Sequence, residues 1–185
     1  EPMETSNYGG LSGIVRRIDT LNEIVGRAIS WLTLAMVVVT FTVVVLRYLF
    51  NIGWIAMQES VTYMHALVFM LGAAYTLKHA GHVRVDIIYR ARSRRVQAWI
   101  DLVGALLLLL PVCLFIGWIS WEYIAASWSV HETSQEAGGI PAVFLLKSVI
   151  LVMAVLLVLQ GISQALTSLL ELLNGSGEAS AGTQD

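Results

Sequence analysis

Four long runs of apolar residues dominate the sequence, and they constrain the fold more than any other feature. A helix needs about 20 apolar residues to cross the hydrocarbon core of a bilayer. Only 13% of the residues are charged, against about 25% in a typical soluble domain, so much of the surface has to face lipid. We therefore expect an all-α integral membrane protein with four transmembrane helices, at about residues 28–46, 55–77, 98–119 and 145–170.

Lysine and arginine residues are distributed unequally between the two sides of these spans. Of the eleven, only Arg47 and Lys147 fall on one side. The others precede the first span or lie between the second and the third. Because basic residues are enriched in cytoplasmic loops, we expect both termini and the 78–97 loop to lie in the cytoplasm.

The residues outside the spans divide the chain into a membrane domain and two short ends. We expect a flexible N-terminus over 1–13, a four-helix domain over 14–172 and a disordered polar tail over 173–185. Apolar residues recur at helical spacing between positions 14 and 25. This segment is either an amphipathic helix on the inner membrane surface or a helical extension of the first span, and the sequence leaves both open.

Ionisable residues inside the spans are candidates for contacts between helices. Glu59 lies early in the second span, and Lys147 lies about 9 Å along the fourth, counted from Pro141 at 1.5 Å per residue. These two could form an ion pair, joined by Arg47 at the end of the first span; alternatively, each side chain snorkels separately to the headgroups. His65 has no second intramembrane histidine with which to bind haem, so it predicts a hydrogen bond between helices.

Small residues indicate where helices approach each other closely. Gly72 opens a Gly-Ala-Ala segment in the second span, and Gly161 lies seven residues from both Ala154 and Ser168 in the fourth. Such residues let helix backbones pack in a membrane, either within the chain or against a partner. Pro111 predicts a kink in the third span.

The sequence carries no pattern that supports an enzyme or a nucleic-acid-binding protein. It contains no zinc-protease histidine spacing, no phosphate-binding loop and no nucleophile elbow. Its single cysteine, Cys113, cannot form an internal disulfide. The net charge of −2 gives no basic bias toward nucleic acid. We expect no cofactor, no metal and no nucleic-acid partner.

Several short stretches follow one another in an informative order. The segment "LGAAYTLKHAGHVRVDIIY" at 71–89 contains Gly-His-Val-Arg-Val-Asp directly after the second span, and "SWSVHETSQEAGGIPAVFLLK" at 127–147 leads into the fourth. They are preceded by "RYLF" at 47–50 and "ESVTY" at 59–63. Together these stretches resemble the DctQ-type small membrane subunit of tripartite ATP-independent periplasmic (TRAP) transporters, from about residue 18 to 172.

The resemblance implies an accessory role in transport across a bacterial inner membrane. Subunits of this type pair with a large DctM-type permease subunit, which carries the substrate and ion sites. A periplasmic DctP-type binding protein delivers an organic acid, and an ion gradient drives its uptake. A different function stays open as the alternative: a self-sufficient small exporter, acting as a homodimer that exchanges protons for substrate through Glu59.

The loop after the second span carries the most specific part of the resemblance. We expect His82, Arg84 and Asp86 to form an ordered turn that supports the hairpin or contacts the large subunit. The basic residues of this loop also attract anionic membrane lipids, by about 1 kcal/mol each. In the alternative interpretation, the loop is solvated and only fixes the orientation of the chain.

Overall fold

The computed structural model describes residues 8–79, 81, 89 and 91–181, and it confirms four long apolar helical segments. The third segment is one continuous rod, Arg94–Ser129, built from two α-helices and a π-helical turn between them. The elements are α1 (Tyr8–Leu49), α2 (Ile55–Lys78), α4 (Arg94–Gly104), η1 (Ala105–Leu109), α5 (Leu110–Ser129) and α6 (Val143–Ala181).

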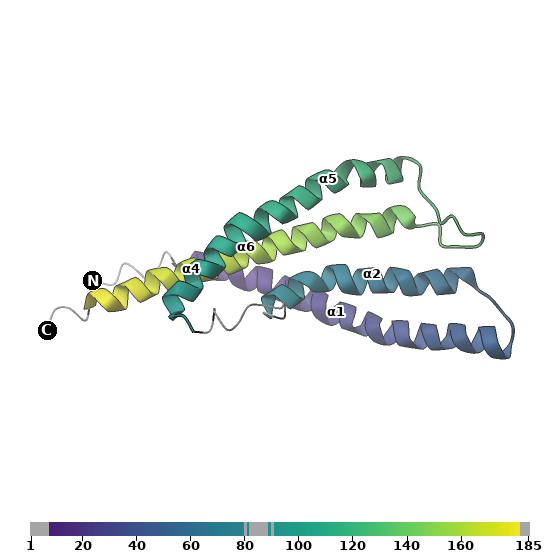
Figure 1. The fold of residues 1–185 in the computed structure, drawn as a ribbon, viewed down its shortest axis with the longest axis horizontal. Helices are drawn as coiled ribbons and strands as arrows, with labels where there is room; N and C mark the ends of the chain where they lie inside the picture. The colour runs from purple at the N-terminus through teal and green to yellow at the C-terminus, as the bar shows by residue number, and fades with distance from the viewer. Residues whose placement is uncertain (1–7, 80, 82–88, 90, 182–185) are drawn as a thin grey trace.

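The four segments are arranged around α6. It packs against α1, α2, α4, η1 and α5, whereas α5 makes no extensive contact with α1 or α2 in the described part of the chain. Figure 1 shows two ends: a terminal end, with the start of α1 and the end of α6, and a hairpin end, with the α1–α2 and α5–α6 connections.

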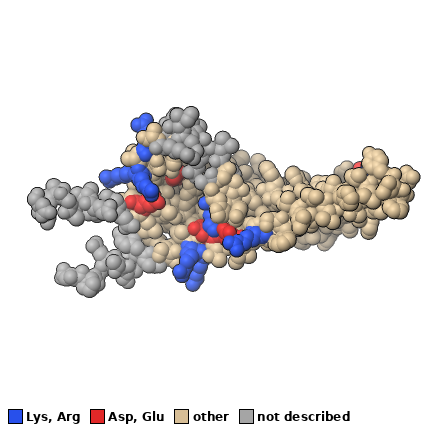
Figure 2. All heavy atoms as spheres, turned by 90° about the horizontal axis from the view of Figure 1, so that it is seen from below, with Lys and Arg blue, Asp and Glu red and all other residues tan. Residues whose placement is uncertain are grey.

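Toward the hairpin end the helices form a single layer. They lie side by side in the order α5, α6, α2, α1 (Figure 1). After a quarter turn the same half of the molecule is narrow (Figure 2). Large apolar side chains such as Phe41, Phe69 and Phe115 are more than 60% exposed. The layer is therefore open on both broad faces and is not a closed bundle.

The helices α1 and α6 are much longer than a membrane span. At 1.5 Å per residue, their 42 and 39 residues correspond to roughly 63 and 58 Å, against a hydrocarbon thickness of about 30 Å. The segment before the first span is therefore a helical extension of that span. Basic and acidic side chains gather near the terminal end (Figure 2).

Both helices also extend past the domain boundaries that the sequence predicts. The sequence predicts a flexible N-terminus over 1–13 and a disordered tail over 173–185. In the structure, α1 begins at Tyr8 and α6 continues to Ala181. Extending an existing helix requires no new nucleation, which explains how these polar and glycine-containing segments remain helical.

Small side chains make the seam between the third and fourth segments. Ala98, Leu102 and Ala105 pack against Ala165 and Leu172 in a buried apolar cluster. In a membrane, where lipid is as apolar as the helix surface, such close packing supplies much of the association between helices. The irregularity expected at Pro111 takes the form of η1, which directly precedes α5 and its N-terminal proline.

Candidate functional site

A polar clasp joins α2 to the loop between α5 and α6 at the hairpin end. Both oxygens of the Glu59 carboxylate accept hydrogen bonds from this loop. The Ser134 hydroxyl donates to Oε1, and the Ile140 backbone N–H donates to Oε2 at 2.6 Å. The loop also closes on itself, because the Ser134 N–H donates to the Ile140 carbonyl at 3.3 Å. We call Glu59, Ser134 and Ile140 the hairpin-end clasp.

Glycine at position 139 permits the close approach of the loop to α2. A methyl group built on Gly139 would lie 2.7 Å from Glu59 Oε2 and would overlap the Ser134 side chain. The preceding Gly138 has a φ of +83°, a conformation that glycine adopts without steric cost. The close approach to the clasp therefore explains glycine at position 139, and the positive φ explains glycine at position 138.

Glu132 makes a second contact at the hairpin end, between the loop and the helices α5 and α6. Its carboxylate accepts hydrogen bonds from the Lys147 ammonium and from the Ser127 hydroxyl. The Lys147 nitrogen also lies 4.1 Å from the centre of the Tyr123 ring. The ammonium of Lys147, followed by the hydroxyl of Ser127, holds the pKa of Glu132 below its ordinary value. Glu132 is therefore ionised at neutral pH.

A buried polar cluster joins α1 to α6 nearer the terminal end. Asp19 Oδ1 accepts hydrogen bonds from the Ser163 hydroxyl at 2.8 Å and from the Gln160 amide at 3.2 Å. Gln160 in turn accepts a bond of 2.6 Å from the Asn22 amide. Asn22 is fully buried and Ser163 nearly so. We call these four residues the terminal-end polar cluster. Because buried polar groups are costly when unpaired, the cluster specifies one register between the two helices.

Glu23 ties α1 to the end of α2. Its Oε2 lies 2.8 Å from Lys78 Nζ and 3.1 Å from His79 Nε2, and its Oε1 accepts a bond of 3.0 Å from Arg27. Gly26, one turn further along, has the Tyr75 ring against it and leaves no room for a side chain. The two helices are thus held together by charge and by close packing at the same level.

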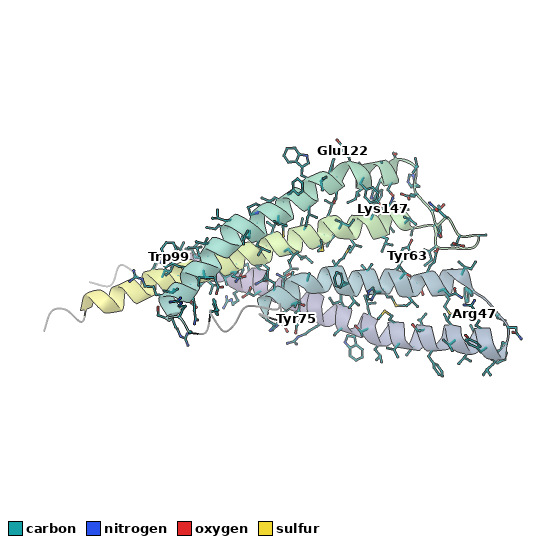
Figure 3. The ribbon with its side chains drawn as sticks, viewed as in Figure 1. Arg47, Tyr63, Tyr75, Trp99, Glu122 and Lys147 are labelled. Atoms are coloured by element: carbon teal, nitrogen blue, oxygen red, sulfur yellow. The ribbon has the colours of Figure 1, made fainter. Side chains whose placement is uncertain are left out.

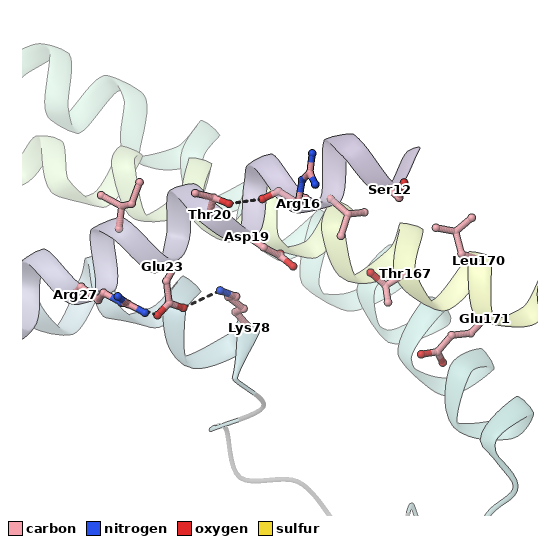
Figure 4. Close-up of a pocket in the computed structure, with 12 residues that line it drawn as sticks. Ser12, Arg16, Asp19, Thr20, Glu23, Arg27, Lys78, Thr167, Leu170 and Glu171 are labelled. Atoms are coloured by element: carbon pink, nitrogen blue, oxygen red, sulfur yellow. Dashed lines mark hydrogen bonds and ion pairs between the residues drawn. The ribbon is translucent and has the colours of Figure 1, made fainter. Parts of the chain in front are cut away.

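A groove of about 710 Å³ opens between α1, α2 and α6 beside these contacts (Figure 4). Its lining contains equal numbers of acidic and basic residues, and two of the cations are already paired with Glu23. Among the residues that the structure describes, no three His, Cys, Asp or Glu side chains come together to hold a metal ion. The groove is open and has a mixed apolar and charged lining, with no excess of either charge to favour an ionic ligand. Its charged residues are Arg16, Asp19, Glu23, Arg27, Lys78 and Glu171.

The structure gives Glu59 and Lys147 different partners. Glu59 belongs to the clasp, and Lys147 pairs with Glu132. Arg47 is exposed at the hairpin end of α1, on the edge of the layer opposite α5 and apart from Lys147 (Figure 3). Glu59, Lys147 and Arg47 are therefore held in separate environments and do not form the ion pair that the sequence offered as one alternative.

The predicted small residues lie on contacts within the chain. A methyl group on Gly72 would lie 3.3 Å from Ile29 on α1, and one on Gly161 would lie 2.9 Å from Leu109 in η1. His82, Arg84 and Asp86 lie outside the described residues. His65 is exposed and stacks on Phe69.

Sequence reasoning missed most of the polar residues that join the helices. The terminal-end polar cluster left a signal, since polar residues stand three apart both at Asp19 and Asn22 and at Gln160 and Ser163. That spacing puts each pair on one helix face. Ser134 and Ile140 carry no periodic pattern because they lie in a loop, and their signal is the 127–147 stretch that contributes to the resemblance.

Comparison with known proteins gives one family and one relative. Residues 36–171 match the family described as "Tripartite ATP-independent periplasmic transporters, DctQ component". The chain is also 33% identical over 90 residues to "C4-dicarboxylate TRAP transporter small permease protein DctQ" of Vibrio cholerae. That alignment covers 48% of this chain and 38% of the relative, so the chain matches well under half of that protein's length. No solved structure matches the chain.

Proposed function

We propose a role for this chain on the basis of its family. The chain belongs to the DctQ component family of tripartite ATP-independent periplasmic (TRAP) transporters. This confirms the resemblance carried by its sequence motifs, and it places the chain in a family of transporter components that are not enzymes. The chain is a small permease subunit of a TRAP transporter. In our proposal it braces a large permease subunit and forms no transport path of its own.

The open layer of helices is the observation that carries this proposal. A solute path through a membrane needs a surrounding wall of protein, because a polar solute in contact with lipid tails is unfavourable. In the described residues, four helices lie side by side and α5 does not close against α1 or α2. A layer of this kind has broad faces that suit a supporting contact with another membrane protein.

The proposed complex has three protein parts and a defined orientation. We propose a large DctM-type permease subunit in the membrane and a periplasmic DctP-type binding protein as its partners. The asymmetry of the basic residues supports placing the terminal end in the cytoplasm and the hairpin end in the periplasm of a bacterial inner membrane. Lipids cover the parts of the layer that no protein contacts.

The proposed cargo is an organic acid whose uptake is driven by an ion gradient. The relative of Vibrio cholerae is named for C4-dicarboxylates, and we extend that class of substrate to this chain. The alternative of a homodimeric exporter working through Glu59 is disfavoured. Both oxygens of that carboxylate are engaged by Ser134 and Ile140, whereas a proton-exchanging carboxylate has to be released in each cycle.

Reconstitution tests the proposed function. Proteoliposomes would carry the large subunit with or without this chain, a sodium or proton gradient, and added binding protein with a labelled C4-dicarboxylate. We expect uptake only when both membrane subunits are present, and none from this chain alone. Uptake by this chain alone, or full uptake without it, would overturn the proposal.

A further inference from the structure

An ionisable side chain is exposed near the middle of α2. His65 lies ten residues after Ile55 and thirteen before Lys78, which is roughly 15 and 20 Å along the helix. Both distances place it at hydrocarbon depth in a bilayer about 30 Å thick. The side chain is on the surface of the layer, not in a seam between helices.

The imidazole ring has no hydrogen-bond partner among the residues that the structure describes. Its contact is a stack on Phe69 at 6.4 Å between ring centres, and none of the described residues hydrogen-bonds either ring nitrogen. Thr40 on α1 differs, although it is also exposed at membrane depth, because its hydroxyl donates to the Met36 carbonyl at 2.7 Å. His65 therefore carries polar atoms that the described part of the chain leaves unpaired.

A stripe of exposed residues surrounds this histidine. Thr62, His65 and Phe69 are spaced three and four apart, so they share one face of α2, and all three are exposed. Phe69 is 73% exposed. We call these three residues the α2 stripe. It combines an aromatic contact area with polar groups at the same depth.

Lipid tails cannot satisfy the stripe. Acyl chains offer no hydrogen-bond donor or acceptor, and ionisable residues inside a membrane almost always face protein or a water-filled cavity. We infer that the α2 stripe docks against a transmembrane helix of the large permease subunit, which supplies a hydrogen-bonding group to the His65 ring. This inference rests on the proposed function, since it names the surface through which the brace is attached.

Substitution at position 65 tests the hydrogen bond. With the two membrane subunits co-expressed, His65→Leu should weaken their association about three- to twenty-fold, the range for one hydrogen bond between helices in a membrane. His65→Gln, which keeps a donor and an acceptor, should recover much of that loss. Thr40→Val is the matched control and should leave association unchanged. Wild-type association with His65→Leu would overturn the inference.

Photo-crosslinking separates the candidate occupants of the stripe. A photoreactive amino acid at position 62 or 69 should form an adduct with the large subunit, and one at position 41 on α1 should not. An adduct with a second copy of this chain, or with lipid only, would overturn the inference while leaving the bracing role intact. If the wild-type chain fails to co-purify with the large subunit, the proposed function itself fails.

Discussion

Asn22 and Gln160, 138 positions apart in the chain, share a hydrogen bond of 2.6 Å between α1 and α6. Both are buried, at 0% and 4% exposed. Gln160→Leu would leave the Asn22 amide without this acceptor, and an unpaired buried polar group costs about 1–3 kcal/mol. We expect a loss of that size in the free energy of unfolding, measured by denaturation in detergent.

A double-mutant cycle identifies the part of this loss that belongs to the pair. Asn22→Leu combined with Gln160→Leu should be less destabilising than the sum of the two single changes, because neither amide is then left unpaired. Gln164→Leu is the matched control, since Gln164 lies one turn along α6 and forms no hydrogen bond with a described residue. Equal losses from Gln160→Leu and Gln164→Leu would contradict the proposed contribution of the pair.

Glu59→Gln should release the loop between α5 and α6. A carboxamide has one acceptor oxygen, whereas the carboxylate accepts from both the Ser134 hydroxyl and the Ile140 N–H. The Ile140 amide should then exchange its hydrogen about tenfold faster or more, because a hydrogen bond to a charged group contributes about 1.5–3 kcal/mol. Hydrogen exchange followed by mass spectrometry measures this. The exposed Glu122 provides the control, and Glu122→Gln should leave the exchange unchanged.

Gly139→Ala should disrupt the hairpin-end clasp, whereas Gly53→Ala should not. The new methyl group at position 139 would lie 2.7 Å from the Glu59 carboxylate, and one at position 53 would have no neighbour within 4 Å. We expect a cost of about 1–3 kcal/mol for Gly139→Ala, as for other overpacked sites, and little change for Gly53→Ala. Thermal unfolding of the two variants in one detergent gives the comparison, and equal midpoints would refute it.

The contribution of Glu132 to stability should disappear in acid. Its pKa is lowered in the folded protein by the Lys147 ammonium and then by the Ser127 hydroxyl. The stabilisation is therefore fully present above the ordinary glutamate pKa of about 4.3, and it is lost as the pH falls through the lower folded value. The difference in unfolding midpoint between wild type and Glu132→Gln should be constant above about pH 5 and shrink below it. A difference in unfolding midpoint that increased as the pH fell would contradict this prediction.

The four spans were predictable because their physical cause is local. A bilayer requires an uninterrupted apolar length, and that length can be counted in the sequence. The prediction for the second span, 55–77, is within one residue of α2, which ends at Lys78. The helical extension of the first span was one of two alternatives that the sequence left open, because the stability of such an extension comes from the adjoining helix and from contact with α6 and not from its own composition.

The partners of the charged residues were not predictable from their position along the helices. Glu59 and Lys147 both lie near the hairpin end of their helices, which made an ion pair reasonable. The loop between α5 and α6 supplies Ser134 as the partner of Glu59 and Glu132 as the partner of Lys147. The path of a loop depends on tertiary contacts. The helical periodicity of the sequence therefore does not reveal that loop residues replace the other helix as partners of Glu59 and Lys147.

Toward the hairpin end the subunit is one helix thick, and a layer of that kind has almost no dry interior from which to gain stability. The seams along α6 therefore carry most of what holds the isolated subunit together. They combine alanine and leucine packing, the close approach at Gly161 and the terminal-end polar cluster. A second protein packed against either broad face would bury side chains that the isolated layer leaves exposed. We therefore expect the subunit to gain much of its thermal stability from the large permease subunit. When it is purified alone, it should unfold at a lower temperature than in the complex.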